Sequence, residues 1–588
     1  MTNSHSASPL IDSAAGDTPR EQDRFQQTVS DCRVQLKTDG KNILTWLKLG
    51  DALLGQRNPT LFPISLACYR KSLQLHADNP AAFHKLGTIF KLLGRQEEAK
   101  AALQRALDLD PGLIRARFTL LDILCPVLYE KKEDIPSSRA AYASQLNELC
   151  ETIDLDGPEA IERAAGAVGK YPFHLAYQGY NDCSLQRQYG SLICRIQAAR
   201  YPQWSRQLPP PSQKTGEPLR IGIVSGFFRN HATWNFPVSG LLQAMDRKRF
   251  ALYGYHTGSR CDHTTDLARQ SFDRFVEDDF SLASLCDRIL ADKLHLLLYP
   301  EIGMNQLAVR LSALRLAPVQ CVSWGHPTTS GLPTMDYFLG SDLMEPADGA
   351  SHYTEKLIRL PNLGVYYPPP ETKAVRMERT ELDLKEDTIL YLCLQSLFKY
   401  HPQHDEVFPR IAQITGNCQF VFTAANMSTP VVNIIRRRLA DVFSRYGMKS
   451  EDYISFIPYL DYPEYLGLYR SGDVFLDTFG WSGGNTTMDA IASDLPVVTL
   501  PGHMMRGRQS MAMLKMMDVT DTIAESVDGY VRIAARLGTD RQWRRQIGDR
   551  VAANKHKLYA DKTSVEYLEL FFERAVADAR RQWDQRTI

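Results

Sequence analysis

The segment that most constrains the fold of this chain is DVFLDTFGWSGGNTTMDAIASDLPVVTLPG, residues 473–502. Its first part, DVFLDTF, is an apolar run typical of a fully buried parallel strand, and LPVVTL near its end is a second such run. A glycine-serine turn separates the first run from a stretch whose apolar residues recur at helical spacing: Met488, Ile491, Ala492 and Leu495. The segment therefore predicts a β-α-β unit with a glycine-rich turn.

The start of the predicted helix, at Asn485, Thr486 and Thr487, is a candidate phosphate site. A helix N-terminus presents unpaired N–H groups and the positive end of the helix dipole, and both attract phosphate. The alternative is a helix cap that binds nothing. The spacing leaves both interpretations open, because this turn is neither GxGxxG nor a Walker loop.

Buried strands alternate with helical stretches over two long parts of the chain. The first series follows the proline-rich break LPPPSQKTGEP and contains LRIGIVSG, FALYGYHTG, LHLLLYPEIG and APVQCVSWGHP. The second begins at Ile389 and continues through CQFVFTA, YISFIPYL, DVFLDTF and LPVVTL. The alternation predicts two α/β domains, at 208–375 and 376–588, each with a doubly wound parallel sheet and ligands at its strands' carboxyl ends. The amphipathic end, SVEYLELFFERAVADARRQW, predicts a last helix that crosses back to the first domain.

The first third of the chain has a different pattern. Residues 1–20 are rich in Ser, Ala, Asp and Gly and are predicted to be a disordered lead-in. Residues 21–126 contain a tetratricopeptide-like repeat from Pro80, a degenerate repeat before it and a third start near Ile114. Residues 127–207 are predicted to be a helical linker domain. So short an array fits either a helical cap on the α/β domains or a peptide-binding groove.

Charge and composition narrow the function classes. The chain has 68 basic and 68 acidic residues, which argues against a nucleic-acid or membrane-surface binder. Its eleven cysteines have no repeated spacing and favour a reducing compartment. The first residues lack the pattern of a secretory signal, and no apolar run approaches the ~18 residues of a membrane span. The sequence predicts a cytoplasmic protein without nucleic-acid or membrane partners.

Five blocks resemble, in order, the protein O-GlcNAc transferase and SPINDLY family. They are GFFRNHATWNF, LRLAPVQCVSWGHPTTSGLPTMDYFLGSD, YTEKLIRLPN, LYLCLQSLFKYHPQHDEVFPRIAQI and the segment 473–502. The resemblance implies a GT-B fold, which is two facing Rossmann-like domains, behind an all-α tetratricopeptide-like domain. It also implies inverting transfer of a sugar, first of all GlcNAc from UDP-GlcNAc, to Ser/Thr hydroxyls of cytoplasmic proteins. The implied partners are a UDP-sugar donor and a protein or peptide acceptor. A second copy of this chain, in a homo-oligomer, is a further candidate partner.

The resemblance implies three catalytic candidates. Lys399 directly follows a strand and matches the family lysine that contacts the leaving diphosphate. His231, in the loop after IGIVSG, matches a family histidine that has been proposed as the general base. Its alternative role is to position the acceptor or the donor. Asp287, in CDRIL, stands where relatives carry an aspartate also proposed in proton transfer, although DRIL is a common helical sequence.

A second set of candidates would bind the donor: Gln395, Ser396, Tyr465, Gly484, Asn485, Thr486, Thr487 and Asp489. Ser396 stands at the family's glutamine position, with Gln395 one place away. Tyr465 aligns with a residue that stacks on uracil, and a helix-core tyrosine is the alternative. Asp489 lies one turn into the helix, where a structural role is the alternative. The chain reads GNTT where the animal enzymes read GHTT.

The loop after CVSWG is the predicted wall of the sugar or acceptor pocket, formed by His326, Pro327, Thr328 and Thr329. The animal enzymes carry tyrosine at the place of His326, whereas bacterial N-glycosyltransferases carry histidine. We predict no metal and no other cofactor, because the histidine pair at 401–404 is isolated. The lysine and the helix dipole can replace a divalent ion on the diphosphate.

Three other interpretations remain open. Two are activities of the same fold, O-fucosyl transfer from GDP-fucose and glucosyl transfer to asparagine. The third is a non-catalytic tetratricopeptide scaffold. Intact Lys399, His231 and GNTT argue against the scaffold, because an inactive protein is free to lose them.

Overall fold

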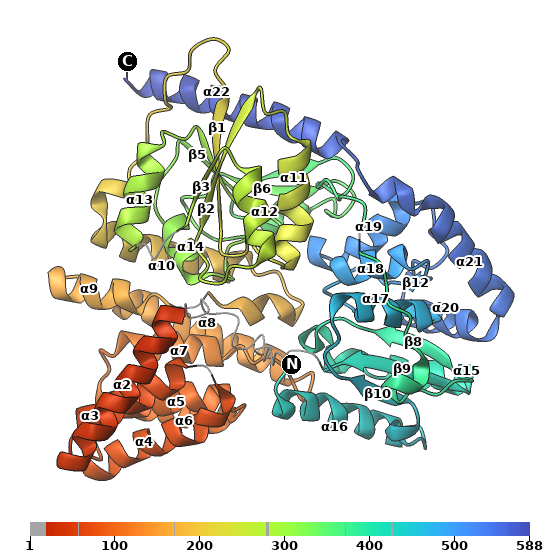
Figure 1. Ribbon diagram of the computed structural model, residues 1–588, viewed down its shortest axis with the longest axis horizontal. Helices are drawn as coiled ribbons and strands as arrows, with labels where there is room; N and C mark the ends of the chain where they lie inside the picture. The colour runs from red at the N-terminus through yellow and green to blue at the C-terminus, as the bar shows by residue number, and fades with distance from the viewer. Residues whose placement is uncertain are drawn as a thin grey trace.

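The computed structural model describes residues 19–56, 58–169, 171–277, 281–370, 372–424 and 427–587. Nearly all of the predicted lead-in, 1–20, lies outside these residues. The chain forms a helical domain, red to orange in Figure 1, and two α/β domains, yellow-green and teal-blue. Two parallel sheets behind an all-helical region are the predicted fold class, and the prediction is confirmed.

The helical domain pairs its first helices as repeats and adds longer helices that lead to the sheets. Its helices are α2 (Pro19–Thr38), α3 (Ile43–Gly55), α4 (Phe62–Leu75), α5 (Pro80–Leu92), α6 (Gln96–Leu109), α7 (Ile114–Ile123), α8 (Asp134–Thr152), α9 (Pro158–Ala167) and α10 (Cys183–Arg200). Helix α5 starts at Pro80, where the repeat is predicted, and α7 at Ile114. A Cβ at Gly87 of α5 would lie 2.6 Å from Leu103 of α6, so glycine permits this close helix pair.

The first sheet domain is built on seven parallel strands in the order β3-β2-β1-β4-β5-β6-β7. The strands are β1 (Leu219–Ser225), β2 (Phe250–His256), β3 (Arg274–Val276), β4 (Leu296–Tyr299), β5 (Val319–Ser323), β6 (Tyr337–Ser341) and β7 (Lys356–Leu360). The helices that connect them include α11 (Ser239–Ala244), α12 (His263–Ser271), α13 (Leu282–Ala291) and α14 (Gln306–Ser312). The apolar runs predicted β1, β2, β4 and β5. They did not predict β3 and β7, which are the two edge strands of the sheet, or β6, which lies between β5 and β7.

The second sheet domain has five parallel strands in the order β10-β9-β8-β11-β12, all of which the sequence predicted. They are β8 (Ile389–Cys393), β9 (Cys418–Thr423), β10 (Ile454–Ile457), β11 (Val474–Leu476) and β12 (Val497–Val498). The helices are α15 (Val407–Thr415), α16 (Thr429–Arg445), α17 (Tyr462–Ser471), α18 (Asn485–Ala492), α19 (Gln509–Met516), α20 (Val527–Thr539), α21 (Arg541–Asn554) and α22 (Thr563–Thr587).

The last helix, α22, ties the two sheet domains together. It leaves the second domain and lies across the first, as the dark blue helix in Figure 1 shows. Its apolar face joins the core of the first sheet domain through Leu568 and Phe572. The carboxylate of Glu569 accepts a hydrogen bond from Arg249, at 2.6 Å, before β2. The two sheet domains therefore share one structural element.

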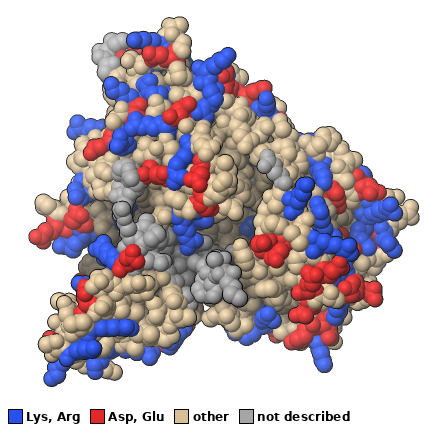
Figure 2. Space-filling view, viewed as in Figure 1, with Lys and Arg blue, Asp and Glu red and all other residues tan. Residues whose placement is uncertain are grey.

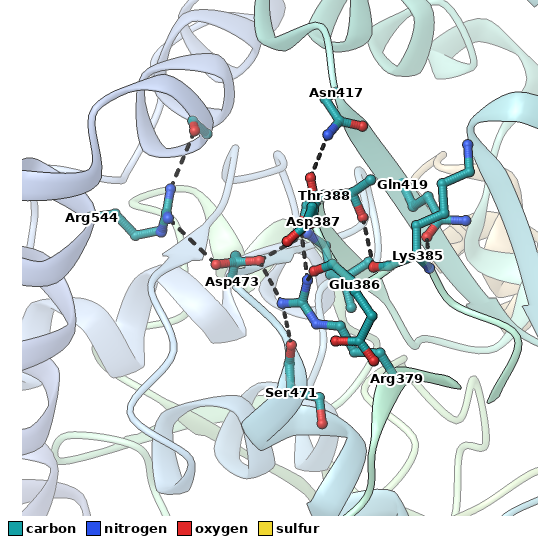
Figure 3. A network of polar contacts seen from close by, with 12 residues as sticks. Arg379, Lys385, Glu386, Asp387, Thr388, Asn417, Gln419, Ser471, Asp473 and Arg544 are labelled. Carbon is teal, nitrogen blue, oxygen red and sulfur yellow. Dashed lines mark hydrogen bonds and ion pairs between the residues drawn. The ribbon is translucent and has the colours of Figure 1, made fainter. Parts of the chain in front are cut away.

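A polar network lies where the strands of the second sheet begin, opposite their carboxyl ends (Figure 3). Arg379 donates to the backbone oxygens of Thr388 at 2.7 Å and Ser471 at 2.8 Å, and to Asp473 at 3.0 Å. The Asp473 carboxylate also accepts from the Leu390 N–H at 3.0 Å. The network thus fixes the starts of β8 and β11 relative to each other.

Figure 2 shows basic and acidic residues mixed over the visible face of the molecule. Among the described residues, no helix combines the length and apolarity that a membrane crossing requires.

Candidate active site

A cavity of about 1060 Å³ lies where the two sheet domains and the helical domain meet. In each sheet the strand order reverses between two neighbours, β1 and β4 in the first and β8 and β11 in the second. Ligands of doubly wound sheets bind at the carboxyl ends of strands beside such a reversal. The loop after β1 carries His231, the loop after β8 carries Lys399, and the loop after β11 leads to α18. All three reach the cavity.

Eight of the predicted site residues line this cavity: His231, His326, Pro327, Ser396, Lys399, Gly484, Asn485 and Thr486. The other predicted site residues are not part of its lining: Asp287, Thr328, Thr329, Gln395, Tyr465, Thr487 and Asp489. The first group comes from both sheet domains, so the fold brings together residues that are far apart in the sequence. The cavity is therefore a shared site of the two sheet domains.

Lys399 is a buried basic residue of the cavity wall. It ends a short 3-10 turn, η7 (Leu397–Lys399), in the loop after β8. Its Nζ donates to the Ser482 carbonyl at 3.1 Å and lies 5.8 Å from the centre of the Trp481 ring. Burial lowers the pKa of Lys399 to about 8, although the Asp477 carboxylate opposes the shift. Burial of an ammonium group costs desolvation free energy, and an anionic ligand beside it would offset that cost.

Asp477 organises the loop after β11, although no motif in the sequence points to it. Its buried carboxylate accepts hydrogen bonds from the Gly483 N–H at 2.7 Å, the Ser482 hydroxyl at 2.6 Å and the Thr499 hydroxyl at 2.7 Å. A Cβ at Gly483 would collide with the hydroxyls of the threonines that follow it. One carboxylate and one glycine therefore set the path of the chain into α18.

Helix α18 starts at Asn485 with Gly484 as its N-cap, and no side chain caps it. Thr486 lines the cavity, and its hydroxyl, within the described part of the chain, is buried without a hydrogen-bond partner. The Asn485 side-chain oxygen accepts from the Tyr367 hydroxyl at 3.2 Å. Thr487 instead shares a hydrogen bond of 2.8 Å with Ser510 and is fully buried. Its side chain therefore fixes the start of α18 to the rest of the domain.

His231 has a defined protonation state. The Thr233 N–H donates to its Nδ1 at 3.1 Å, and its ring stacks on Phe227 with centroids 4.2 Å apart. Burial, with a smaller contribution from Arg229, lowers the pKa of His231 to about 3. The ring is therefore neutral near pH 7, and because Nδ1 accepts a hydrogen bond, Nε2 carries the proton. In this state Nε2 can donate a hydrogen bond but cannot take up a proton.

The loop after β5 contributes a second neutral imidazole. Burial, followed by Arg506, lowers the pKa of His326 to about 3. Among the described residues, the buried Nε2 of His326 has no hydrogen-bond partner, and Thr328 nearby is buried as well. Thr329 is held by the buried carboxylate of Glu355, to which its hydroxyl donates at 2.6 Å. His326 and Pro327 thus face the cavity, while Thr329 anchors the loop.

Four other predicted residues are placed apart from the cavity. Asp287 is on the exposed side of α13. Gln395 is fully buried, donates to the Leu476 carbonyl at 3.2 Å and accepts from the Tyr400 hydroxyl at 2.8 Å. The contacts of the remaining two are within the second sheet domain. The Tyr465 hydroxyl donates to the Leu394 carbonyl at 3.0 Å, and Asp489, whose pKa burial raises to about 7, accepts from the Tyr462 hydroxyl at 2.8 Å.

No three His, Cys, Asp or Glu side chains of the described ranges are grouped as metal ligands. His401, from the isolated histidine pair, donates from Nε2 to the Tyr177 carbonyl. Metal-independent chemistry stays a prediction.

Known proteins share both sheet domains with this chain. The family model described as "Glycosyl transferase family 41" matches residues 190–366 and 369–566. A "Probable UDP-N-acetylglucosamine--peptide N-acetylglucosaminyltransferase SPINDLY" of Arabidopsis thaliana is 25% identical over 366 residues, which are 60% of this chain and 38% of that protein. The "UDP-glucose:protein N-beta-glucosyltransferase" of Actinobacillus pleuropneumoniae serotype 5b (strain L20) is 22% identical over 391 residues, 64% of this chain and 59% of that protein.

A solved structure of an O-GlcNAc transferase variant from Thermobaculum terrenum has the same fold. It superposes with a TM-score of 0.68 at 23% identity, over 96% of this chain and 100% of that one. The chain spans about two fifths of the length of the SPINDLY relative. The family model covers both sheet domains, including the loops that carry Lys399, His231 and the start of α18. By this match, the chain belongs to glycosyltransferase family 41.

Proposed function

We propose that this protein is an inverting glycosyltransferase that moves a sugar, GlcNAc from UDP-GlcNAc, to Ser/Thr hydroxyls of cytoplasmic proteins. The observation that carries the proposal is the meeting of Lys399, the uncapped start of α18 and His231 at one cavity. The relatives named above act, by their names, on proteins with UDP-GlcNAc or UDP-glucose.

The second sheet domain would hold the leaving diphosphate. Lys399 supplies a cation, and the start of α18 supplies backbone N–H groups and the Thr486 hydroxyl. As the bond between the sugar and the diphosphate breaks, negative charge grows on the diphosphate oxygens. Donors and cations already in place stabilise that charge without reorganisation, and such stabilisation commonly contributes more to catalysis than any other single effect.

The first sheet domain would orient the reacting groups. His231 presents an Nε2–H donor, and with Nδ1 already accepting from Thr233 it is not set up to remove the acceptor proton. We therefore assign His231 the positioning role, which supports the second of its two predicted roles. The proton of the acceptor would leave through water or through the diphosphate itself.

The acceptor would approach along the helical domain. The same cavity continues to the repeats and to the segment after α7, where it is lined by Gly94, Glu97, Lys100, Pro126 and Tyr129. A nucleotide-sugar would occupy the part between the sheets, beside Lys399, the start of α18 and His231. The remainder leaves room for a segment of polypeptide.

The test is a panel of donors against the purified protein, with UDP-GlcNAc, UDP-glucose and GDP-fucose as its arms. Donor hydrolysis and thermal shift report which nucleotide and sugar bind, because a ligand at 100 times its Kd adds about 2.7 kcal/mol of stability. Mass spectrometry of a co-expressed acceptor distinguishes Ser/Thr from Asn. Hydrolysis of UDP-GlcNAc is the expected result. A protein that binds and hydrolyses none of the three would be a scaffold, against the proposal.

A first prediction concerns His231. We expect His231→Ala to lower turnover roughly 10²-fold while UDP affinity changes little, because one hydrogen-bond donor to the reacting groups is lost. His231→Gln places an amide N–H near the former Nε2 and should recover about tenfold of that loss. Steady-state kinetics and calorimetry with UDP measure both effects. Equal losses in the two variants would instead favour a general base, since an amide cannot take up a proton.

A second prediction concerns the repeats. A variant that lacks residues 1–112 keeps α7, whose Phe118 ring packs edge-on against Tyr189 of α10 at 6.3 Å. We expect it to hydrolyse the donor at a nearly normal rate and to transfer sugar to protein about tenfold less well, a loss of ~1.4 kcal/mol in acceptor binding. Paired hydrolysis and transfer assays measure the two rates. Normal transfer to a full-length acceptor would show that the repeats are only a cap.

A further inference from the structure

A short segment of the helical domain lies between the two sheet domains at the cavity. It is the 3-10 helix η2 (Phe173–Gln178), from the linker before α10. Its Phe173 ring stacks on His326 of the first sheet domain, with centroids 4.8 Å apart and planes at 20°. Its Tyr177 ring stacks on Trp481 of the second, at 3.9 Å and 14°. We call Phe173 and Tyr177 the aromatic wedge, because together they stack on rings of both sheet domains.

The aromatic wedge is part of the cavity wall and adjoins the residues of the proposed reaction. Phe173, Tyr177, His326 and Trp481 all line the cavity. The Trp481 ring lies 5.8 Å from Lys399 Nζ, and the next residue along the chain, Ser482, accepts that ammonium's hydrogen bond. The rings of His326 and Trp481 are themselves 5.6 Å apart. A shift of the aromatic wedge would therefore move both walls of the site.

The segment around the aromatic wedge is fixed on all sides. Before it, the Tyr171 hydroxyl donates to the Thr329 carbonyl at 2.9 Å. Within it, the Tyr177 carbonyl accepts from His401. After it, the buried Asp182 carboxylate accepts from Arg139 of α8 at 2.7 Å and from Arg506 of the second sheet domain at 2.9 Å. These contacts reach the helical domain and both sheet domains, so η2 has one defined position.

We propose that Phe173 and Tyr177 are positioning residues of the glycosyl transfer. The aromatic wedge holds His326 and Trp481 at a fixed separation, and so sets the width of the cavity and the place of Lys399 beside it. This inference rests on the proposed function. It makes the linker before α10 part of the active site, although both sheets lie after it in the sequence.

Ordinary core packing would also bury aromatic rings, and it predicts a different outcome. A core tyrosine contributes volume, so leucine would replace it with a loss of stability and an unchanged reaction in the molecules that stay folded. A positioning residue contributes the flat face that stacks on Trp481. Phenylalanine keeps that face, whereas leucine keeps only the apolar volume.

The experiment compares Tyr177→Leu with Tyr177→Phe in the full-length protein. We expect Tyr177→Leu to lower kcat for both donor hydrolysis and transfer by roughly 10- to 100-fold with a smaller change in KM, because misplaced groups lose most in the reacting geometry. Tyr177→Phe should retain kcat. In Tyr177→Leu the alkaline limb of the pH profile should also move upward, because water that reaches Lys399 relieves the burial that lowers its pKa.

The matched control is Tyr69→Leu, which removes a fully buried tyrosine of the helical domain that is not part of the cavity lining. It should lose stability and keep kcat. Wild-type kcat and an unmoved pH profile in folded Tyr177→Leu would overturn the inference, as would equal losses in the two leucine variants. If Tyr177→Leu does not fold, Phe173→Leu is judged by the same criteria. A failure of the proposed function is distinct, because the wild-type protein would then show neither hydrolysis nor transfer.

Discussion

Replacement of Lys399 by alanine is expected to lower turnover by roughly 10²-fold or more, because the variant loses the cation that would stabilise charge on the leaving diphosphate. Affinity for UDP should fall as well, since the same contact is made in the bound state. The fold should persist, because Lys399 ends a turn beside a cavity and is not part of the apolar core. Steady-state kinetics, calorimetry with UDP and the thermal unfolding midpoint measure the three effects.

The pH dependence of the wild-type protein provides a second measurement on the same residue. The pKa of Lys399 is about 8 in the folded protein, below its usual value of 10.5, so the free enzyme loses this charge as the pH rises through 8. We expect kcat/KM to fall above that pH. Between about pH 8 and 10.5 the unfolded chain binds more protons at this site than the folded one, so this group's contribution to stability rises with pH. Both effects should disappear in Lys399→Ala.

The control for Lys399 is Lys385→Ala, in the same domain at the opposite edge of the sheet. Lys385 donates from Nζ to the Asp452 carbonyl at 2.6 Å and is exposed. Its replacement should leave turnover and the pH profile unchanged. Near-normal turnover in Lys399→Ala would reject the assignment of Lys399 to the diphosphate.

The largest effect on stability is expected at Asp182. Its buried carboxylate lies between Arg139 at 2.7 Å and Arg506 at 2.9 Å, and only 1% of its side chain is exposed. Asp182→Asn keeps the shape and removes the charge, which leaves two guanidinium groups without their shared partner. Removal of one member of a buried ion pair costs about 3–5 kcal/mol. Urea unfolding should therefore show a marked loss of stability.

An exposed pair of the same chemistry provides the matched control for Asp182. Asp521 accepts from Arg550 at 2.6 Å, but 41% and 43% of the two side chains are exposed. Exposed pairs contribute about 0–1 kcal/mol, so Asp521→Asn should hardly change the unfolding midpoint. Similar midpoints in the two variants would mean that the buried pair is no stronger than a surface one.

The sequence was sufficient to predict most strands of the two sheets and the loops that line the cavity. The strands that flank the site are apolar runs followed by loops that contain glycine or lysine, and strand ends in doubly wound sheets converge on ligands. The loop that carries Lys399 and the loop that carries His231 could be found in this way. The helix start at Asn485 could be found as well, because hydroxyl residues there precede a helical apolar pattern.

Contacts between distant segments could not be predicted. Nothing in the local sequence of Tyr177 shows that its ring stacks on Trp481, in a different domain, because stacking depends on how three domains pack. It was equally hard to predict which of two neighbouring residues lines the cavity. Gln395 and Ser396 differ by one position, but the first is buried between strands and the second lines the cavity. That difference depends on where β8 ends.

The strand β11 has only three residues, and a buried or half-buried aspartate stands at each end of it. Asp473 fixes the strand's start to Arg379, and Asp477 fixes the loop that follows it to Thr499. The loop 478–484 thus follows a short strand whose two ends are held by separate hydrogen bonds to other parts of the domain. A loop 478–484 from another member of the family could be grafted onto the same strand. Such grafts should succeed when both aspartates are retained and fail by misplacement of the loop, not by unfolding, when only Asp477 is lost.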